Sequence, residues 1–210
     1  MQQGFRRLFL SGTVILCTFV QMGLNQQGYA NNSVSVAQLE EYLEALDTLR
    51  ADFIQSNADG TKSEGVIFLQ RPRKARIRYF PPDTGIIIAQ GGSVSIFDTK
   101  SNTGPTVAPV GATPLAPLLS RRIDLTDPNI FLRHLVGTTF NEIHLGINKG
   151  HFKGHVELQF LNDPITLIGW VYVDEFGNRT SLHLNNPQWG IKLDQRIFNI
   201  ALQKEVLGLE

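Results

Sequence analysis

The sequence predicts a mainly β (α+β) domain built on one large, twisted antiparallel sheet that curls into an incomplete β-barrel. An N-terminal helix and two short helices are expected to cross its open side. Short apolar segments recur along most of the chain and are separated by turn residues, which is typical of successive strands. No crossover helix stands between consecutive strands of the second half, so neighbouring strands are expected to be antiparallel.

The first thirty residues are predicted to be a cleaved secretory signal peptide. Arg6 and Arg7 precede the largely apolar segment 8–20, and Gly28-Tyr29-Ala30 supplies small residues at the cleavage positions. The alternative is an uncleaved membrane anchor. Polar residues between the apolar segment and the cleavage site argue against it, because a membrane span needs about 20 apolar residues.

Residues 31–210 are predicted to form a single exported domain. Cys17 is the one cysteine of the chain, and the bulky Leu16 before it argues against lipid attachment there. Cleavage after Ala30 removes two arginines and no acid, so the mature chain has 17 basic and 19 acidic residues, a formal charge of −2. Without a basic surplus, we expect no nucleic-acid partner.

An amphipathic helix is predicted over residues 36–49. Ser35 and Gln38 have the spacing of a capping box, in which each side chain satisfies a free backbone N–H. Apolar residues then recur at helical spacing, and acidic residues occupy the opposite face. Such a helix packs on a sheet, and the pattern allows either a dry core or a ligand cavity beneath it.

Three strands are predicted next, over residues 52–57, 61–70 and 74–80. Asp59-Gly60 supplies the positive φ that a tight hairpin needs. Pro72 cannot donate to a sheet, so the chain turns there or runs along an edge. In the third strand apolar residues alternate with arginines, which predicts one apolar face.

A second hairpin is predicted from strands 85–90 and 93–98, followed by a loop or weak edge strand over residues 100–111. Two short helices are expected at 114–119 and 129–136, the second because Asp127-Pro128 places a capping residue before a proline. These helices either fill a core or form a lid over a cavity.

The remainder of the chain predicts strand after strand. The expected strands are 141–148, 151–161, 166–174, 179–185 and 189–194, with a last strand reaching Phe198. Segment 167–173 is apolar on both faces, which is typical of a strand covered on both sides.

No catalytic, metal or cofactor site is predicted. His151 and His155 are four residues apart, which on a strand separates them by about 13 Å. A zinc ion holds each nitrogen at about 2 Å, so this pair cannot chelate one ion. No nucleophile elbow, phosphate loop or dinucleotide motif occurs. We therefore expect no enzymatic activity, no metal and no cofactor.

Residues 49–83 resemble the LolA family of periplasmic lipoprotein carriers. The matching pattern is Asp52-Phe53-Ile54-Gln55, Gly65, Leu69, Arg71-Pro72, Arg76, Tyr79 and Pro82-Asp83. Segments 92–98 and 113–119 are also similar to family segments. The resemblance covers residues 49–137 well and 138–200 loosely. Beyond Phe198 the chain departs from the family, because no Pro-Pro-x-Gly type ending follows.

The resemblance implies a carrier that binds the acyl chains of lipoproteins. Its implied partners are acylated lipoproteins, an inner-membrane ABC transporter and an outer-membrane receptor similar to LolB, and a monomer is expected. Arg71 matches the family arginine that holds a helical lid shut by bonding to lid backbone. The expected lining of the acyl-binding cavity, with the inward strand face left open, is Phe53, Ile67, Leu69, Ile77, Tyr79, Ile88, Ile96, Leu115, Leu118, Leu119, Phe131 and Leu135.

Two alternatives stay open at this point. One is a receptor similar to LolB, against which the absence of a usable lipid-attachment cysteine argues. The other is a periplasmic carrier of sterol-like or phospholipid cargo that has no protein client.

Overall fold

The computed structural model describes residues 33–209, with the exception of residues 102 and 150–151. The predicted signal peptide lies outside the described residues. The described residues form one compact unit. In this described part of the chain, no helix is long and apolar enough to cross a membrane.

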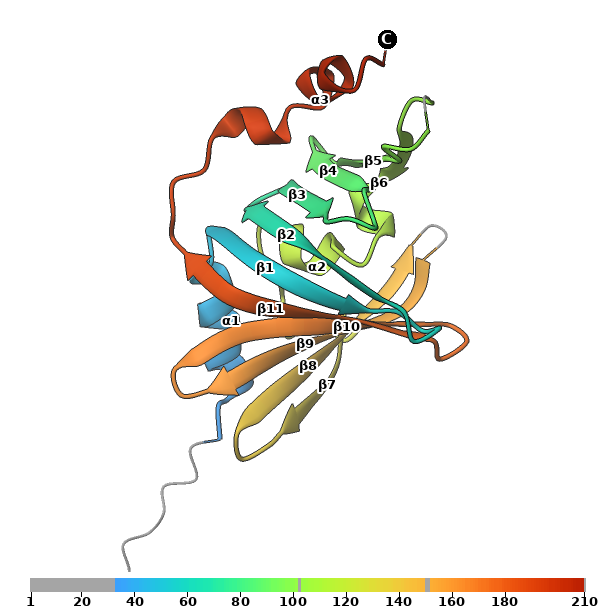
Figure 1. Ribbon diagram of the computed structural model, residues 1–210. Coiled ribbons are helices and arrows are strands. Elements are labelled where there is room, and N and C mark those ends of the chain that lie inside the picture. The colour runs from blue at the N-terminus through green and yellow to red at the C-terminus, as the bar shows by residue number, and fades with distance from the viewer. Residues whose placement is uncertain (1–32, 102, 150–151, 210) are drawn as a thin grey trace, which may run out of the picture. The chain divides into compact units, whose positions relative to one another are not determined.

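The unit is built on one antiparallel sheet of eleven strands, which confirms the predicted fold class (Figure 1). The strands are β1 (Thr48–Ser56), β2 (Lys62–Gln70), β3 (Lys74–Tyr79), β4 (Ile86–Gln90), β5 (Ser93–Phe97), β6 (Thr106–Pro109), β7 (Phe131–Val136), β8 (Phe140–Lys149), β9 (Phe152–Asn162), β10 (Ile165–Asp174) and β11 (Arg179–Trp189). Their order is β6-β5-β4-β3-β2-β1-β11-β10-β9-β8-β7. Because β6 and β7 stand at opposite ends of this order, the sheet stays open.

The connection from β6 to β7 therefore has to pass from one edge of the sheet to the other. It carries the short 3₁₀ helix η1 (Val110–Ala112) and the helix α2 (Ala116–Leu119). Helix η1 follows β6 in the chain but contacts β8, near the opposite edge. The connection thus crosses the inner face of the sheet, the face that the main hydrophobic cluster occupies.

Helix α1 (Val36–Ala45) covers another part of the inner face. The predicted capping box is present, because the Ser35 hydroxyl accepts from the Gln38 N–H and the Gln38 side chain accepts from the Ser35 N–H. Leu39 and Leu43 are fully buried beneath the helix. The N–H of Leu167, beside a bulge in β10, donates to the hydroxyl of Tyr42 at 3.0 Å. Helix α1 is therefore anchored by both apolar contacts and a polar one.

The C-terminal segment covers part of the outer face. It comprises the 3₁₀ helix η2 (Gln195–Phe198) and the helix α3 (Ile200–Val206), and it contacts β3 and β4. Ile200 and Leu207 pack against a small cluster of outer-face residues from β4 and β5. As expected for a strand covered on both sides, β10 buries residues on both faces, with Trp170 in the inner cluster and Val171 opposite the outer-face Glu157.

The prediction of a helix over residues 129–136 is wrong, because this segment forms the edge strand β7. The Asp127 carboxylate accepts from the N–H of Asn129, and the Asp127 carbonyl accepts from Phe131. Asp127 therefore closes a turn instead of starting a helix. The free edge of β8 then supplies hydrogen-bond partners to the segment, and this tertiary pairing overrides the helix-compatible local sequence.

The last predicted strands also differ from the structure. Strand β11 runs without a break from Arg179 to Trp189, so no separate strand occupies residues 189–194. Phe198 belongs to η2 and is fully buried. The remaining strand predictions agree with the structure to within a few residues, and the weak edge strand suspected in residues 100–111 is β6.

Gly65 on β2 allows two aromatic rings to meet across the inner face. It pairs with Phe53 on β1 and with Tyr79 on β3, and the two rings meet edge to face at 5.4 Å. A Cβ atom at Gly65 would lie 2.3 Å from the carbonyl oxygen of Arg78 and 2.6 Å from the ring of Phe53. Any side chain at this position therefore has to displace backbone or the Phe53 ring.

We predict that Gly65→Ala lowers the free energy of unfolding by about 1–3 kcal/mol, the usual cost of overpacking a core. Urea denaturation of the two proteins measures the difference. Gly104→Ala is the matched control, because a Cβ atom there meets nothing within 4 Å. Equal stabilities of the Gly65→Ala variant and the wild type would contradict the packing described.

Candidate functional site

The inner face of the sheet and its covering helices share one buried apolar cluster. Most residues expected to line a cavity belong to it, namely Phe53, Ile67, Leu69, Ile77, Leu115, Leu118 and Leu119, and Tyr79 and Phe131 pack against it. Leu39 and Leu43 of α1 lie in the same cluster. In this state the side chains of α1 and α2 occupy the space over the sheet.

The other three expected lining residues lie elsewhere. Ile88 faces the outer side of the sheet, in the cluster beneath α3, because Ile87 and Ala89 are the inward residues of β4. Ile96 is 42% exposed near the end of β5. Leu135 is 39% exposed and stands opposite Glu142, because strand pairing with a bulge replaces the expected helix.

Arg71 joins the turn after β2 to the ends of both covering helices. Its guanidinium donates to the carbonyl oxygen of Leu43 and, at 3.4 Å, to that of Leu46, where α1 ends. It also donates to the carbonyl oxygen of Ser120, just after α2, from two nitrogens at 2.8 and 3.2 Å. One side chain thus satisfies carbonyl groups that neither helix can satisfy by itself.

Backbone hydrogen bonds reinforce this junction. The N–H of Arg71 donates to the carbonyl of Asp47 at 2.8 Å, and the N–H of Arg73 donates to that of Leu119 at 3.0 Å. The turn between β2 and β3 is therefore bonded to both helical segments even without the guanidinium.

The charge of Arg71 has few compensating partners. Burial lowers the pKa of Arg71, while the carboxylates of Asp47 and Glu44 act to raise it. In the described part of the chain, the side chain of Arg71 donates only to backbone carbonyl oxygens. Carbonyls at a helix C-terminus carry partial negative charge, so they suit a guanidinium without neutralising it.

A second, weaker link joins the helical segments at the surface. Arg122, in the connection after α2, lies 3.0 Å from a carboxylate oxygen of Glu44 and 3.8 Å from one of Glu40. The Arg122 side chain is 71% exposed, and an ion pair of this kind contributes about 0–1 kcal/mol. Arg71 is therefore the stronger of the two side-chain links.

A cleft of about 510 Å³ opens beside α2. It lies between the segment from α2 to β7 and strand β8, and its lining is Gly111, Ala116, Pro117, Ser120, Arg122, Ile123, Asp127, Asn129, Ile130, Gly146 and Ile147. Ile123 and Ile147 also belong to the buried cluster. The cleft therefore reaches the apolar interior at the margin of α2.

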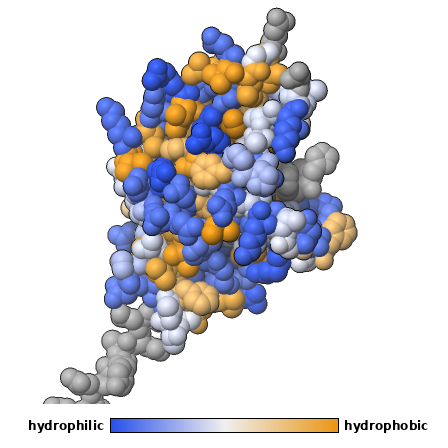
Figure 2. Space-filling view, in the orientation of Figure 1, coloured by the Kyte–Doolittle hydropathy of each residue, from blue (hydrophilic) through white to orange (hydrophobic). Residues whose placement is uncertain are grey.

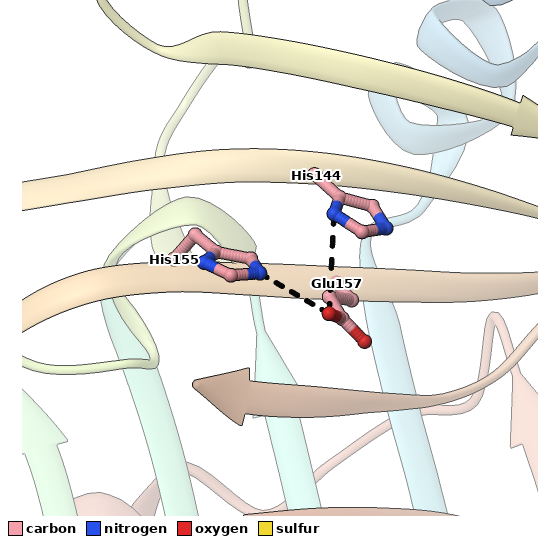
Figure 3. Close-up of side chains that lie close together, drawn as sticks. All are labelled: His144, His155 and Glu157. Atoms are coloured by element: carbon pink, nitrogen blue, oxygen red, sulfur yellow. Dashed lines mark hydrogen bonds and ion pairs between the residues drawn. The ribbon is translucent and has the colours of Figure 1, made fainter. Parts of the chain in front are cut away.

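On the outer face, His144 of β8 lies beside His155 and Glu157 of β9 (Figure 3). The two imidazole rings stack with their centroids 5.3 Å apart, and one atom from each of the three side chains lies within 4.8 Å of the others. His155 was expected not to share a metal with His151, which lies outside the described residues. The pairing of β8 with β9 instead brings His144 next to His155. The spacing of residues within one strand could not indicate this contact between two strands.

Arg179 pairs with the one carboxylate of this cluster. It donates to both carboxylate oxygens of Glu157, at 3.0 and 2.6 Å. On the other side, a nitrogen of His144 lies 3.3 Å from the carboxylate of Glu142. The arrangement is therefore an ion-pair network that the protein completes with its own groups.

Burial of Glu157 opposes its ionisation, but hydrogen bonds from Arg179 and His155 outweigh this effect. Together they hold the pKa of the Glu157 carboxyl below its usual value. Glu157 is 4% exposed, so its negative charge depends on these partners.

Two kinds of residue at the site have no sequence signal of their own. Ser120 takes part through its backbone carbonyl, which any residue possesses. Leu39 and Leu43 were part of the apolar stripe of the predicted helix, but the stripe alone does not say which sheet face it meets.

The chain is similar to a family model and to several known proteins. Residues 44–201 match the family model described as outer membrane lipoprotein carrier protein LolA. An outer-membrane lipoprotein carrier protein of Methylococcus capsulatus is 30% identical over 191 residues, which cover 83% of this chain and 88% of that protein. An uncharacterized protein of Rickettsia prowazekii is 28% identical over 83 residues, covering 40% of this chain and 39% of that protein. A solved LolA superfamily protein of Nitrosomonas europaea has a TM-score of 0.43 and 10% identity, covering 79% of this chain and 98% of that chain.

We predict that Glu157→Gln lowers the free energy of unfolding near neutral pH by roughly 1–3 kcal/mol, because Arg179 and His155 lose a charged acceptor. A carboxyl with a depressed pKa contributes stability above its unfolded pKa of about 4.3, and this contribution is lost as the pH falls through the folded value. The difference between wild type and variant should therefore shrink below about pH 4.

Urea denaturation from neutral to acid pH measures this difference. Glu64→Gln is the control, because Glu64 is exposed on β2 and the substitution should have a small effect on stability. A Glu157→Gln difference that stays constant down to acid pH would contradict the ion-pair network.

Proposed function

Because the chain belongs to the LolA family of outer-membrane lipoprotein carrier proteins, we propose that it shields the acyl chains of lipoproteins while they cross the periplasm. It receives them from an inner-membrane ABC transporter and delivers them to an outer-membrane receptor similar to LolB. The observation that best supports this proposal is the apolar cluster beneath α1 and α2. The turn that carries Arg71 fastens both helices to the sheet.

The space for cargo is the space that the helices now fill. Leu39 and Leu43 of α1 and Leu118 and Leu119 of α2 lie against the inner face and are almost completely buried. When α1 and α2 move outward, these side chains leave an apolar surface that acyl chains can cover. The empty protein in this way avoids exposing that surface to water.

Energetics favour a carrier that closes when it is empty. Burying an acyl chain gains about 0.8 kcal/mol per CH₂, so one long chain alone contributes on the order of 10 kcal/mol. A permanently open cavity with that affinity would release its cargo too slowly for a shuttle. The contacts broken when the helices lift reduce the net affinity, and their return favours release.

Arg71 is the lock of this closed state in our proposal. Its hydrogen bonds to Leu43, Leu46 and Ser120 hold the two helices at the same turn. Hydrogen bonds to carbonyl groups can be exchanged when a partner offers other acceptors, whereas an apolar replacement would only add contact with bound acyl chain.

We predict that Arg71→Leu leaves the protein folded and able to bind lipoprotein but at least tenfold slower in delivery to a receptor. An in vitro transfer assay from the loaded carrier to receptor-containing membranes measures the rate. Arg73→Leu is the matched control, because Arg73 is exposed in the same turn and contributes to the junction through its backbone. Delivery by the Arg71→Leu variant at the wild-type rate would contradict the proposed role of Arg71 as the lock.

Cargo binding gives a further prediction. A fluorescent fatty-acyl probe should bind the purified protein saturably, and Leu119→Asp should weaken the affinity by more than tenfold, because a charge in an apolar site is costly to bury. Val107→Asp is the control, since Val107 is 61% exposed. Circular dichroism verifies that both variants fold, and Leu119→Ala provides a milder change at the same position.

Failure of the probe to bind the wild-type protein would contradict the carrier proposal. Binding of the probe, together with copurification of free phospholipid and no lipoprotein from the periplasm, would instead support a carrier of other lipids.

We further propose that residues 1–30 are removed on export and that the periplasmic protein begins at Asn31 without a lipid. The intact mass of the exported protein measures this directly. A mass that includes Cys17 with attached acyl groups would indicate a membrane-anchored receptor.

A further inference from the structure

A groove of about 450 Å³ lies on the outer face of the sheet, beneath the C-terminal segment. Its lining comes from β2, β3 and residues 194–206, and consists of Phe68, Arg76, Arg78, Asp194, Arg196, Ile197, Asn199, Leu202, Gln203 and Val206. This face is opposite to the one that α1 and α2 cover, because the β3 arginines alternate with the inward residues Ala75 and Ile77.

The groove carries more positive than negative charge. Three guanidinium groups and one carboxylate line it, a net charge of +2. Arg196 is paired with Asp194 at 2.8 Å. In the described part of the chain, neither Arg76 nor Arg78 forms an ion pair, so two cationic groups of the groove have no carboxylate.

Arg76 is held in place by neutral acceptors. It donates to the carbonyl oxygen of Ile197 at 2.9 Å and to the side-chain oxygen of Gln203 at 2.7 Å. Burial and the nearby charge of Arg78 both lower the pKa of Arg76. An anion in the groove would relieve both effects, and a planar guanidinium suits phosphate oxygens in particular.

Exposed aliphatic side chains stand at the rim of the same groove. Leu202 and Val206 lie one turn apart on α3 and are 38% and 72% exposed. They project from the helix, while Ile200 and Leu207 attach it to the sheet. In Figure 2, hydrophobic and strongly hydrophilic surface lie side by side over the C-terminal segment, at the top of the view.

We propose that this groove binds the phosphate headgroup of an anionic phospholipid, so that the outer face docks reversibly on a membrane surface. Arg76 and Arg78 contact the phosphate, and Leu202 and Val206 enter the region between headgroups and acyl chains. Basic residues beside exposed aliphatic ones on a helix are the pattern of interfacial membrane binding. Exposed aliphatic side chains beside two guanidinium groups that have no carboxylate partner favour an anionic lipid surface over a protein partner.

This site lies on the opposite face from the acyl-binding cluster and does not depend on the proposed carrier function. A small number of charges and two aliphatic side chains give weak, salt-sensitive association, because stable anchoring takes more than one strong signal. Docking would therefore hold the protein near a membrane without retaining it there.

Cosedimentation with vesicles tests the proposal. The purified exported protein should sediment with vesicles that contain about one third phosphatidylglycerol, should not sediment with pure phosphatidylcholine vesicles, and should be released by salt. Arg78→Glu should reduce the partition coefficient about tenfold, because it reverses a charge at the surface. Val206→Asp should also weaken binding. Binding of the acyl probe should not change in either variant.

Arg121→Glu is the matched control, because it makes the same charge change on an exposed residue beside α2. The proposal is overturned if the protein ignores anionic vesicles, if Arg78→Glu binds like the wild type, or if Arg121→Glu loses binding equally. Binding of inorganic phosphate without vesicle binding would show a free-anion site instead. A photocrosslinker at position 206 that captures a protein instead of lipid would also overturn it.

Discussion

The hydrogen bonds between the turn that carries Arg71 and the two inner helices are the interaction on which the placement of these helices depends. Helix α2 has only four residues and α1 only ten, so neither is stable in water without tertiary contacts. Their apolar side chains supply most of the attachment to the sheet, but that attachment has little directionality. The guanidinium and the neighbouring backbone N–H groups supply direction, because they fix where each helix ends. Apolar contacts thus attach the two helices to the sheet, and the hydrogen bonds from the Arg71 turn set their position.

The open sheet explains why α2 lies across the inner face. Its strands run outward from the β1–β11 pair in two directions, so the chain finishes the first half at β6 and has to start the second at β7. The segment between these edges crosses the inner face and carries α2 with it. A barrel closed between β6 and β7 would need no such crossing, and its interior would have to be filled by strand side chains alone. The outer face, by contrast, is covered over part of its area by the C-terminal segment.

The sequence was most informative where local patterns and tertiary structure agree. Strands β1 to β5 follow from short apolar segments and turn residues, and the capping box at Ser35 follows from a local hydrogen-bonding rule. Strand β7 could not be predicted, because its local sequence suits a helix and the edge of β8 decides its conformation. The apolar run Ile86-Ile87-Ile88 has no alternation, so the sequence does not tell which residue faces inward, and Ile88 lies on the outer face.

The site was predictable only in part for the same physical reason. Arg71 was singled out through a family resemblance, whereas its acceptors are backbone carbonyl groups that carry no residue signature. The His144–Glu157 network joins neighbouring strands, so its members are distant in sequence. The C-terminal segment departs from the family pattern. The groove beneath it has no sequence signal, because its lining combines residues 194–206 with residues of β2 and β3.

The crossing segment also sets the kinetics of the helix that it carries. In the proposed carrier cycle α2 lifts from the inner face. Because residues 110–130 are joined to both sheet edges, it cannot diffuse away, and its return is a first-order process. A short tether of this kind gives an effective local concentration in about the millimolar range, which no soluble competitor for the apolar surface readily matches. In the proposed carrier, the protein's own leucines would therefore replace each departing acyl chain before a second copy of the chain could reach the exposed surface. The tether would thereby protect the carrier from self-association at the moment when cargo leaves.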